Sequence, residues 1–379
     1  MSEMTEGKNQ KLELDKLLEL DGPVSLIITA QLRNVSSEDR FQPAGFPQMG
    51  HVIYDAPRTD GTVEKVCIVD SAASMANHLE SVCLANGRDV DLHPDLQGLP
   101  FVVCVTDDDD KDSKNKRPVT STLKEGHRLA SDYFLDGHRI QKENGQEKID
   151  ETTFRENLRN SFKIKEIKKG KTYFIYPENW WDIYSTIFRY DPNSLIHGVL
   201  FAKEQIKINR MLTAHMEAYG AKRVSSSGVK FDQLGKTTSG QPIFSVDEEI
   251  ANEIRATFIV DLALLRSYGR KECDESEKGL GDSQKRLLLE LILWKIGRLL
   301  KQPFRFRSNC FLKCTKIEVM DETKSYEGSL PDFNIQNAID KCDFEGERII
   351  NVYYPSDKLF KVGTDDESIE DGNEEDIQD

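Results

Sequence analysis

The stretch HVIYDAPRTDGTVEKVCIVDSAASMANHLESVCL, residues 51–84, indicates the fold class of this chain. Its first part holds two runs rich in β-branched residues, HVIYDA and VEKVCIV, on either side of a turn at Asp60-Gly61. Such a pattern is typical of a strand hairpin. Its second part, SAASMANHLESVCL, repeats apolar residues three or four positions apart, as an amphipathic helix does. A hairpin that leads into a helix predicts a mixed α+β fold, not a doubly wound parallel sheet.

Strand and helix patterns alternate on both sides of this stretch. Further strands are expected at 24–32, 99–106, 195–202, 256–265 and 304–320, the last of them long and bent. Further helices are expected at 121–137 with Ser121 as N-cap, at the basic segment 140–170, at 209–220 and at 284–300. The order predicts an α+β, ferredoxin-like core with insertions.

The two ends of the chain differ in composition from its middle. Residues 1–22 are polar apart from a short Leu-rich helix pattern, KLELDKLLELDG. Residues 361–379 carry nine acidic residues and one lysine, a net charge of −8, with few apolar residues. Because such a segment cannot bury enough apolar surface to fold, we expect it to be disordered. The expected organisation is a polar segment 1–22, a domain 23–360 and an acidic tail 361–379.

Composition sets the class of protein. Apolar residues make up 38% of the 379 residues, enough for a sizeable core, and no apolar run has the roughly 18–20 residues of a membrane span. The first ten residues, MSEMTEGKNQ, contain no hydrophobic region, so we expect no secretory signal and a cytoplasmic protein. Seven scattered cysteines argue against a disulfide framework. Cys310 and Cys314 lack a second ligand pair, so no zinc site is expected.

The charge is negative overall but uneven. The net charge is −15, and removal of the −8 tail leaves −7 for the first 360 residues. Residues 155–171 hold seven Lys or Arg against two Glu, and residues 301–316 hold five Lys or Arg and no acid, so each carries +5. Since binding of a charged partner depends on local potential, these basic segments keep nucleic acid among the candidate partners.

Motifs that carry catalysis are missing from the sequence. There is no GxxxxGK[ST] phosphate loop, no GxGxxG motif and no GxSxG nucleophile elbow. The seven histidines form neither HExxH nor a finger pair. The run from Asp107 to Asp110 could hold magnesium, but four consecutive acids repel one another, and a solvated loop is the simpler interpretation. We therefore expect no enzyme, no cofactor and no metal.

Three groups of basic residues could instead contact RNA. Arg305 and Arg307 stand two apart on an expected strand, so both should face one side, toward solvent, a carboxylate or a phosphate. His127-Arg128 lies on an expected helix, and Arg40-Phe41-Gln42 places a cation beside an aromatic ring in a loop, which suits phosphate contact and base stacking. An ordinary solvated surface explains the first two groups about equally well, and most triplets such as Arg40-Phe41-Gln42 are structural.

Six collinear blocks carry a family resemblance. They are DRFQPAGFPQMGHVIYDA (39–56), VDSAASMANHLE (69–80), VTSTLKEGHRLASDYFLDG (119–137), DPNSLIHGVLF (191–201), FIVDLALLRSYG (258–269) and LWKIGRLLKQPFRFRSNCFL (293–312). Together they resemble the backbone subunit of type I-G (formerly I-U) CRISPR surveillance complexes, within the RAMP superfamily. The chain departs from that family in Phe311-Leu312, which follow Cys310 where an acidic or polar residue is usual, and in its acidic tail.

The resemblance implies an RRM-like (ferredoxin-like) core with helical insertions and a protruding thumb hairpin, which we place at about residues 220–243 or else at 106–119. It implies copies that polymerise along CRISPR RNA and present it for pairing with target DNA, together with a large subunit and a guide-processing subunit. The implied RNA-binding residues are Arg33, Arg40, Phe41, Gln42, Ser71, Ser74, Asn77, His127, Arg128, Lys222, Arg223, Arg305 and Arg307.

Two alternatives stay open on the sequence. Distantly related type III backbone subunits cut target RNA through a loop aspartate, and Glu38 and Asp39 follow the first strand here, which leaves a metal-dependent ribonuclease possible. A binder of a small ligand is the weaker alternative. For the acidic tail, we expect that it either projects away from bound RNA or shields a basic patch until RNA displaces it.

Overall fold

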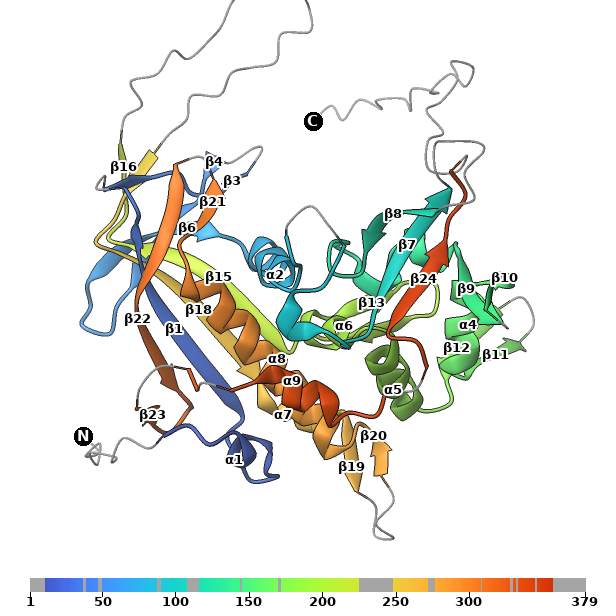
Figure 1. Ribbon diagram of the computed structural model, residues 1–379. Coiled ribbons are helices and arrows are strands. Elements are labelled where there is room, and N and C mark those ends of the chain that lie inside the picture. The colour runs from blue at the N-terminus through green and yellow to red at the C-terminus, as the bar shows by residue number, and fades with distance from the viewer. Residues whose placement is uncertain are drawn as a thin grey trace, which may run out of the picture.

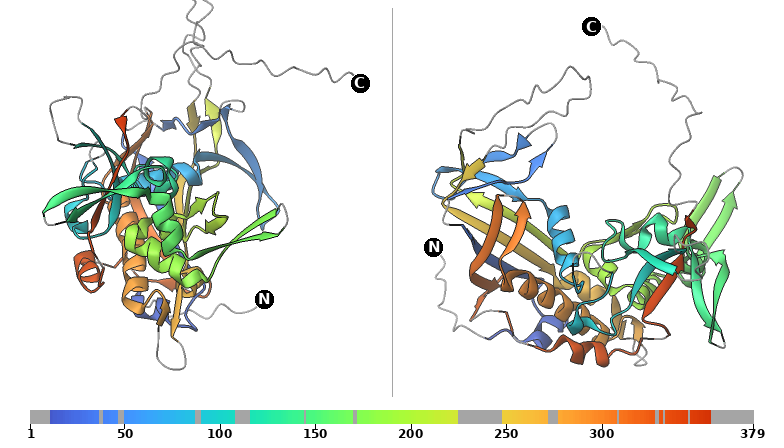
Figure 2. Two further views of the ribbon diagram at one scale, coloured as in Figure 1. Left: turned by 90° about the vertical axis from the view of Figure 1, so that its right-hand side faces the viewer. Right: turned by 45° about the horizontal axis from the view of Figure 1, so that its top comes forward.

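Two β-sheets stand side by side, with helices between and below them (Figure 1). The computed structural model describes residues 11–36, 39–46, 50–86, 90–107, 116–143, 145–169, 172–224, 248–271, 277–307, 309–327, 330–331, 333–344 and 346–356. The larger sheet has eight strands and the smaller has five. Helix α2 (Ala72–Ser81) lies between the two sheets in Figure 1 and again in the right-hand view of Figure 2.

The centre of the larger sheet consists of four antiparallel strands. They run in the order β22 (Cys310–Met320), β1 (Ser25–Asn34), β18 (Glu253–Asp261) and β15 (Leu212–Tyr219). Along the chain these are the fourth, first, third and second strands. Helix α2 comes between the first and second, and α8 (Asp282–Lys301) between the third and fourth. This is the strand order of a ferredoxin-like fold, so the expected α+β, RRM-like core is confirmed.

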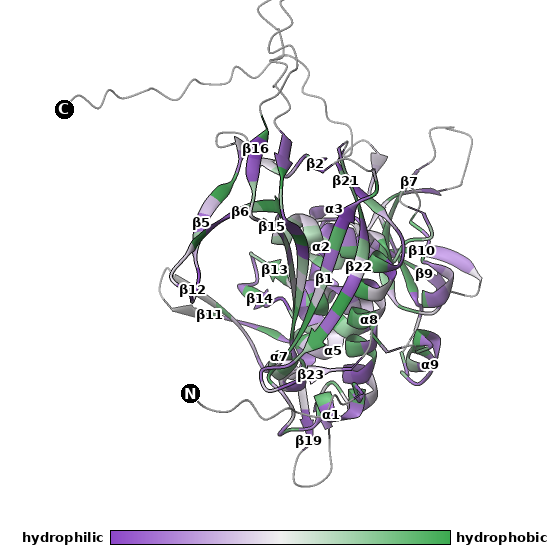
Figure 3. Ribbon diagram, turned by 90° about the vertical axis from the view of Figure 1, so that its left-hand side faces the viewer, coloured by the Kyte–Doolittle hydropathy of each residue, from purple (hydrophilic) through white to green (hydrophobic). Residues whose placement is uncertain are grey.

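Three more strands and a short one extend this sheet. Beyond β15 it continues through β6 (Val63–Asp70) and β5 (Ile53–Pro57), the hairpin expected from the sequence. Beyond β22 it ends in β21 (Phe304–Arg307), while β23 (Ser325–Tyr326) pairs with the far end of β22. Alternate residues of β1 and β15 are buried, which matches a sheet with one face on the core. Green and purple alternate along these strands in Figure 3.

Helix α8 is the centre of the core. Eleven of its twenty residues are buried, and it contacts α2, β22, α6 (Pro192–His197), α7 (Leu262–Ser267) and α9 (Ile335–Asp340). A helix that is apolar on most sides must be covered on most sides, and this one is. Each fully buried leucine contributes roughly 1.5–3 kcal/mol relative to an exposed one, so this Leu-rich helix is a main source of stability.

The second sheet is built from the middle of the chain and closed by its last strand. Its order is β10 (Gln146–Thr153), β9 (His138–Glu143), β24 (Ile349–Tyr353), β7 (Phe101–Asp107) and β8 (Lys116–Ser121). β24 pairs with β7 in parallel and with β9 antiparallel. Residues far apart in the sequence therefore share one sheet.

Shorter elements connect the two sheets. Around the second sheet lie α3 (Asp132–Leu135), α4 (Phe154–Ser161), α5 (Trp180–Tyr190) and the hairpins β11–β12 (Ile164–Lys169, Thr172–Pro177) and β13–β14 (Val199–Phe201, Ile206–Ile208). Elsewhere lie α1 (Leu14–Leu18) and the pairs β19–β20 (Gly269–Lys271, Glu277–Gly279), β3–β4 (Gly45–Phe46, Gly50–His51) and β16–β17 (Lys222–Val224, Glu248–Ile250), with β2 (Arg40–Phe41) beside β17. Two 3-10 turns, Pro94–Leu96 and Arg128–Ala130, complete the set.

The helix expected at 209–220 is wrong, because this segment forms strand β15. Its Leu, Ala, Met and Glu residues favour helices one by one. In the structure Leu212, Ala214 and Met216 alternate with less buried residues, and β15 pairs with β18 on one side and β6 on the other. Pairing on both edges outweighs the local preference.

The helices expected at 121–137 and 140–170 are also wrong. Ser121 ends strand β8 and is not an N-cap, and only the 3-10 turn and the short α3 follow it. Arg128 adopts a left-handed backbone (φ 53°), which interrupts a helix. Residues 140–170 contain the β9–β10 hairpin, strand β11 and a single helix, α4, whose N-cap Thr153 forms a capping box with Glu156.

Two expected strands are divided in the structure. Residues 195–202 begin as the end of α6 and become strand β13 only after Gly198 (φ 77°). The segment 304–320 reverses direction and forms two strands, β21 and β22, in which Phe304 pairs with Leu312. The strands expected at 24–32, 99–106 and 256–265 and the helices at 71–84 and 284–300 are present, with α7 beginning inside the last of the three strand ranges.

The outer parts of the expected organisation are only partly described. The Leu-rich N-terminal pattern forms α1, which ends at Leu18. In the proposed thumb, residues 220–224 are described and hold β16, whereas 225–243 lie outside the described residues. Most of the alternative position, 106–119, and the whole acidic tail, 361–379, also lie outside them. Among the described helices, none is long and apolar enough to cross a membrane.

The cysteines behave as core thiols. Six lie in the described residues and all six are free; all are buried except Cys314. Burial raises the pKa of the Cys104 and Cys310 thiols to about 12, so they remain protonated near neutral pH. Neither they nor any described histidine or carboxylate joins a group of three that could hold a metal ion.

Candidate nucleic-acid interface

The N-terminus of α2 carries three of the residues expected to bind RNA. Ser71 is its N-cap and accepts a hydrogen bond from the Ser74 backbone N–H (3.3 Å), while Asn77 is exposed one turn further along. Together with the adjacent Asp70 and with Arg307 of β21, these residues form what we call the α2 face. A helix N-terminus favours anions, but Asp70 already lies beside this one.

Arg307 is held by the protein itself. Its guanidinium donates to Asp70 Oδ1 (3.0 Å) and to the Val69 carbonyl (3.2 Å). Burial alone would raise the pKa of Asp70, but hydrogen bonds from His78, Arg307 and Ser74 outweigh burial and lower it. Of the three surroundings left open by the sequence, solvent, a carboxylate or a phosphate, the structure shows a carboxylate, that of Asp70. The predicted phosphate contact would require Arg307 to leave that carboxylate.

Arg305 does not share the surroundings or the partners of Arg307. The pairing of β21 with β22 shifts register between the two arginines, so simple alternation along the strand does not describe them. Arg305 is exposed and its Nε donates to the Arg307 carbonyl (3.3 Å). The neighbouring Phe306 ring instead packs edge-on against His78, with ring centroids 4.8 Å apart.

The Arg40-Phe41-Gln42 triplet also differs from the expectation. Phe41 is 1% exposed and belongs to the core, so it is not available to stack on a base, and that assignment is wrong. Arg40 pairs with Glu248 (3.0 Å), and the Gln42 backbone N–H donates to the Asn309 carbonyl. A strand of only two residues, β2, has one side chain turned inward, and here that side chain is the aromatic one.

Arg128 is buried and forms the best ion pair of this region. It donates to both carboxylate oxygens of Glu80 on α2 (2.6 and 2.9 Å) and to the carbonyls of Gly126 and Gly198 (3.3 Å each). Both members of the pair are at most 6% exposed. Arg128 is thus a structural residue, and its expected position on a polar helix face is wrong.

A buried polar network continues from this pair. Glu80 also accepts a hydrogen bond from the Asn193 amide (2.8 Å), Asn193 accepts one from Lys295 of α8, and the Lys295 ammonium lies 3.1 Å from His197 Nε2. Burial first, and then the nearby Lys295 and Arg128 charges, lower the pKa of His197 well below its usual value. The imidazole is therefore neutral, and the network ties α2, α6 and α8 together.

The same network leaves one imidazole nitrogen of His197 without a partner among the described residues. Because the Lys295 ammonium can only donate, His197 Nε2 acts as the acceptor and the ring proton resides on Nδ1. That buried Nδ1 has no hydrogen-bond partner among the described residues. His197 itself is among the residues around the cleft described next, but its Nδ1 atom is buried.

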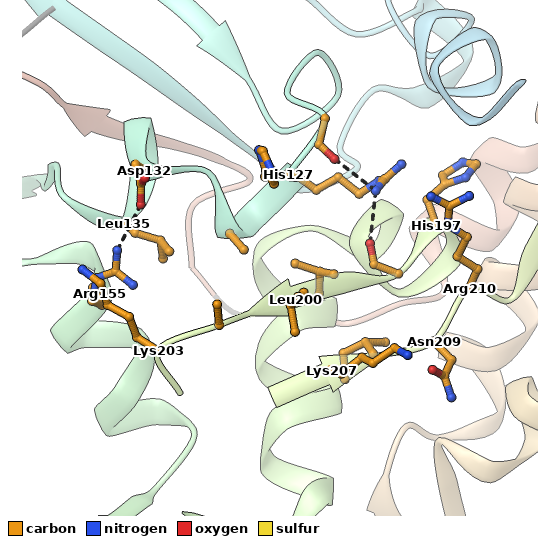
Figure 4. Close-up of a pocket in the computed structure, with 17 residues that line it drawn as sticks. His127, Asp132, Leu135, Arg155, His197, Leu200, Lys203, Lys207, Asn209 and Arg210 are labelled. Atoms are coloured by element: carbon orange, nitrogen blue, oxygen red, sulfur yellow. Dashed lines mark hydrogen bonds and ion pairs between the residues drawn. The ribbon is translucent and has the colours of Figure 1, made fainter. Parts of the chain in front are cut away.

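This cleft is about 720 Å³ in volume and strongly basic. It is bounded by the 3-10 turn, α3, the end of α6 and the β13–β14 hairpin (Figure 4). We call it the basic cleft, because its polar lining contains three lysine or arginine side chains on residues 203–210, two more arginines, two histidines and one acid: Lys203, Lys207, Arg210, Arg128, Arg155, His127, His197 and Asp132.

The cations of the basic cleft differ in availability. Arg155 pairs with Asp132 (3.2 Å) and Asp136 (3.0 Å), and Arg128 is paired with Glu80. Lys203, Lys207 and Arg210 are exposed, and within the described part of the chain no acidic side chain pairs with them. Figure 4 shows their side chains around the cleft. These three positive charges are free to meet an anion.

Sequence reasoning missed these three residues. Lys203 and Lys207 lie between the expected strand 195–202 and the expected helix 209–220, and Arg210 lies in the first turn of that expected helix. The one available signal was the alternation of Lys207 with buried Ile206 and Ile208, which marks a short strand with a polar outer side, and it does not extend to Lys203 or Arg210. Of the predicted residues, only His127 and Arg128 line this cleft.

The remaining predicted residues lie elsewhere. Lys222 and Arg223 are on β16, where Arg223 pairs with the buried Glu249 (3.1 Å). Arg33 lines a separate groove of about 670 Å³ at the end of β1. That groove mixes signs, since Lys313 is its other basic residue and Asp39 and Glu253 are its acids. Asp39 is thus near a surface groove, while Glu38 lies outside the described residues.

Comparison with known proteins gives one family and one distant structure. Residues 26–223, 198 of the 379, match the sequence model of a family described as CRISPR-associated protein GSU0053 (Cas_GSU0053). No curated protein sequence matches. Among solved structures, the crystal structure of Thermofilum pendens Csc2 is similar, with 8% identity over 87% of this chain and 75% of that one and a TM-score of 0.30, a likeness too weak to carry an argument.

Proposed function

We propose that this chain, which belongs to the family of CRISPR-associated protein GSU0053, is an RNA-binding backbone subunit of a CRISPR surveillance complex. The family match over more than half of the chain is the observation that carries this proposal. In finer detail we propose a type I-G complex, in which copies assemble along the CRISPR RNA in the cytoplasm beside a large subunit and a guide-processing subunit. Target DNA would then be read by pairing with the exposed guide.

The basic cleft supplies the chemistry that such a subunit needs. A phosphodiester carries one negative charge per nucleotide, and three unpaired cations in one cleft can each neutralise a phosphate. His127, which is exposed, adds a ring at the rim of the cleft. None of these contacts would distinguish one base from another, as is needed in a protein that must hold guides of any sequence.

The neighbouring α2 face serves the same proposal in a different way. The buried pair of Glu80 and Arg128 joins α2 to the wall of the basic cleft. Glu80 lies in the last turn of α2 and Ser71 is its N-cap, so the two regions share this helix, and we propose that an RNA strand bound to the cleft continues along it toward Ser71, Ser74 and Asn77. We propose no catalytic role for any of these residues.

The central experiment uses three neutral substitutions in the cleft. Lys203→Gln, Lys207→Gln and Arg210→Gln together should weaken binding of a single-stranded RNA of guide length and lower the slope of log K against log salt by about two units, since each lost contact on a single strand removes about 0.7. Lys11→Gln, Lys16→Gln and Lys341→Gln, on other elements, make a control of equal charge change. An equal loss in both triple variants would show that only total charge matters and would refute the cleft assignment.

Assembly and catalysis are tested separately. Light scattering should show that the protein forms larger particles with CRISPR RNA and the partner subunits than without RNA. A protein that stays monomeric in that mixture is not a backbone subunit. Incubation of the assembled complex with target RNA and Mg²⁺ should leave the RNA intact. Cleavage that is lost in an Asp39→Asn variant would favour the ribonuclease alternative.

A further inference from the structure

The larger sheet has one covered face and one open face. Helices α2 and α8 pack against one side of it (Figure 1), and the side chains of β1, β18 and β15 that point to that side are buried. The alternate side chains point the other way and keep part of their surface exposed, as Ile27, Thr257 and Ile259 do. The described chain leaves this outward side of β22, β1, β18 and β15 in contact with solvent, and we call it the open face.

The open face lacks the side chains with which a sheet binds RNA. Sheets of the RRM type stack bases on aromatic rings and meet phosphates with cations. The four strands are in register at the heights of Ile27, Thr29 and Gln31, and no outward position there is Phe, Tyr or Trp. The charged outward side chains at these heights are two cations and two acids, Arg255, Lys316, Glu217 and Glu318. With His215 neutral their charges cancel, so the open face suits a protein partner better than a nucleic acid.

The strand register makes the open face complementary to itself. The two middle strands of the four are β1 and β18, in which Ile27 pairs with Ile259 and Thr29 with Thr257. A two-fold axis that runs parallel to the strands, between β1 and β18, places β1 of one copy over β18 of a second copy at the same height. Ile27 then meets the second copy's Ile259, and Thr29 meets the second copy's Thr257. The centre of such a contact is uncharged, and each pair occurs twice.

The outer strands β22 and β15 bring opposite charges together under the same symmetry. Lys316 of β22 and Glu217 of β15 lie at one height, and Glu318 of β22 and His215 of β15 lie at the next. The two-fold axis places Lys316 over the second copy's Glu217, and Glu318 over the second copy's His215. Each facing pair therefore joins an acid and a basic side chain, at the rim of an uncharged centre, as in known protein interfaces.

A two-fold axis across the strands gives a poorer match. When it is centred at the height of Thr29, every strand lies over its own counterpart, so Glu318 meets the second copy's Glu318. Arg255 then lies over the second copy's Ile259, which removes water from a guanidinium without a new partner. The charge pattern therefore selects the axis along the strands.

The size of the open face predicts a weak contact. Four strands about 4.8 Å apart and about seven residues long, at about 3.3 Å per residue, cover roughly 900 Å² when both copies are counted. Stable complexes bury about 1,200–2,000 Å², so this contact should form and separate reversibly. Packed sheets cross at about 30°, which shifts side chains on the outer strands, about 7 Å from the axis, by about 4 Å. Long side chains such as Lys316 and Glu217 span that shift.

We infer that this chain forms a two-fold symmetric dimer in the absence of RNA, through the open faces of two copies. Such an interface is closed after two copies, so it differs from a contact that would line up many copies along an RNA. The inference goes beyond the proposed function and does not rest on it. The basic cleft is lined by other elements, so the dimer and the cleft are tested by different substitutions.

Sedimentation velocity of the full-length protein, freed of nucleic acid, measures the dimer. As the concentration rises, the sedimentation coefficient should increase reversibly from the monomer to the dimer value, with a dissociation constant on the order of 10–100 µM. Ile259→Lys places a cation over the second copy's Ile27 at two symmetric positions, so it should weaken the dimer by about tenfold or more. Because 36% of Ile259 is exposed, the variant should still fold, and an unchanged melting temperature confirms this.

An exchange of charges tests the pairing itself. Lys316→Glu places an acid over the second copy's Glu217, and Glu217→Lys places two lysines together, so each variant alone should dimerise about tenfold more weakly than the wild type. In an equal mixture of the two variants, both contacts of the mixed dimer again join an acid and a base, so dimers with one copy of each should form. Isotope labelling of one variant and native mass spectrometry identify them. Lys313→Glu, on the same strand beyond the register shift, is the matched control and should change dimerisation little.

The outcomes are distinct from those of the RNA experiments. A protein that stays monomeric without RNA at 100 µM, about the upper end of the expected dissociation constants, would overturn the inference. A dimer that survives both Ile259→Lys and Lys316→Glu would lie on another surface and would also overturn it, and failure of the mixed dimer would refute the two-fold pairing. Loss of RNA binding in Ile259→Lys with unchanged dimerisation would assign the open face to RNA. The triple variant of the basic cleft should dimerise as the wild type does, so failure of the proposed function and failure of the dimer are observed separately.

Discussion

The α2 face and the basic cleft show how differently two basic regions of one molecule can use their charge. On the α2 face, Arg307 is engaged by Asp70 and a backbone carbonyl, and nearby Arg40 by Glu248. In the basic cleft, Lys203 and Lys207 face no acid of the described chain. The comparison teaches that a basic residue marks a binding site only where the fold leaves its charge uncompensated, and the following predictions test that difference.

The largest effect is expected behind the cleft, at the buried ion pair. Arg128→Ala leaves the Glu80 carboxylate buried without its bidentate partner, so the free energy of unfolding should fall by about 3–5 kcal/mol. Urea unfolding followed by circular dichroism measures it. The double variant Glu80→Gln, Arg128→Met removes both charges and should recover part of the loss. A single variant of wild-type stability would mean that the network does not support the cleft wall.

The next effect is a pH dependence that arises from Asp191. Burial raises the pKa of this carboxyl to about 6 in the folded protein, against about 3.9 in an unfolded chain. Because the folded state holds the proton more tightly, this group contributes stability below pH 4 that is lost as the pH rises to about 6. The loss should be roughly 1–3 kcal/mol, since one pKa unit corresponds to about 1.4 kcal/mol.

Asp191→Asn is the matched test of this pH dependence. It keeps the shape of the side chain and can still cap α6, but it does not titrate. Unfolding curves at pH 4, 5, 6 and 7 should show a smaller fall in stability between pH 4 and 6 for the variant than for the wild type. The effect belongs to the network behind the cleft, so RNA binding at constant pH should change little. Identical pH profiles would contradict the assignment.

The third prediction compares one arginine of the α2 face with one lysine of the basic cleft, because substitutions of the two should have opposite effects on stability and on RNA binding. Arg307→Gln breaks a part-buried pair with Asp70, so it should lower the free energy of unfolding by about 1–3 kcal/mol and leave the salt slope of RNA binding nearly unchanged. Lys207→Gln should do the reverse, with unchanged stability and a slope lower by about 0.7. If Arg307→Gln lowers the slope as much as Lys207→Gln does, then the α2 face binds phosphate in spite of its internal partner.

Elements with long, consistent patterns could be predicted from the sequence. The run LLLELILWKIGRLL has no polar side wide enough for solvent, and it became the buried helix α8. The alternation in VSLIITAQL gave β1. The sequence MLTAHMEAY failed, because its residues favour a helix one by one and only its place between β18 and β6 makes it a strand. That place depends on partners about 40 and 150 residues away along the chain, which no local pattern contains.

The site was harder to predict for a related reason. An arginine in the sequence is a potential phosphate ligand, but the acid that it pairs with in the fold decides its role. Glu80 and Arg128 are 48 residues apart, and Asp70 and Arg307 are 237 apart, so local sequence does not reveal these pairs. Phe41 looked like a stacking ring because its neighbours are polar, yet the inward turn of β2 buries it. Lys203, Lys207 and Arg210 drew no attention because their value lies in the absence of a described acidic partner.

The smallest effect on stability is expected for Arg40, which has an acidic partner, as Arg307 does, but is more exposed than Arg307. Its pair with Glu248 is partly exposed, with 46% of the Arg40 side chain and 17% of the Glu248 side chain accessible, and surface pairs contribute about 0–1 kcal/mol. A double-mutant cycle of Arg40→Gln and Glu248→Gln should therefore give a coupling below 1 kcal/mol in the free energy of unfolding.

Because so weak a pair can open, Arg40 remains able to turn toward a phosphate. Arg40→Gln should then lower the salt slope by less than Lys207→Gln, and Glu248→Gln, which removes the charge of this one partner, should raise it slightly. A slope that responds to neither substitution would place Arg40 outside the RNA path and confine binding to the basic cleft.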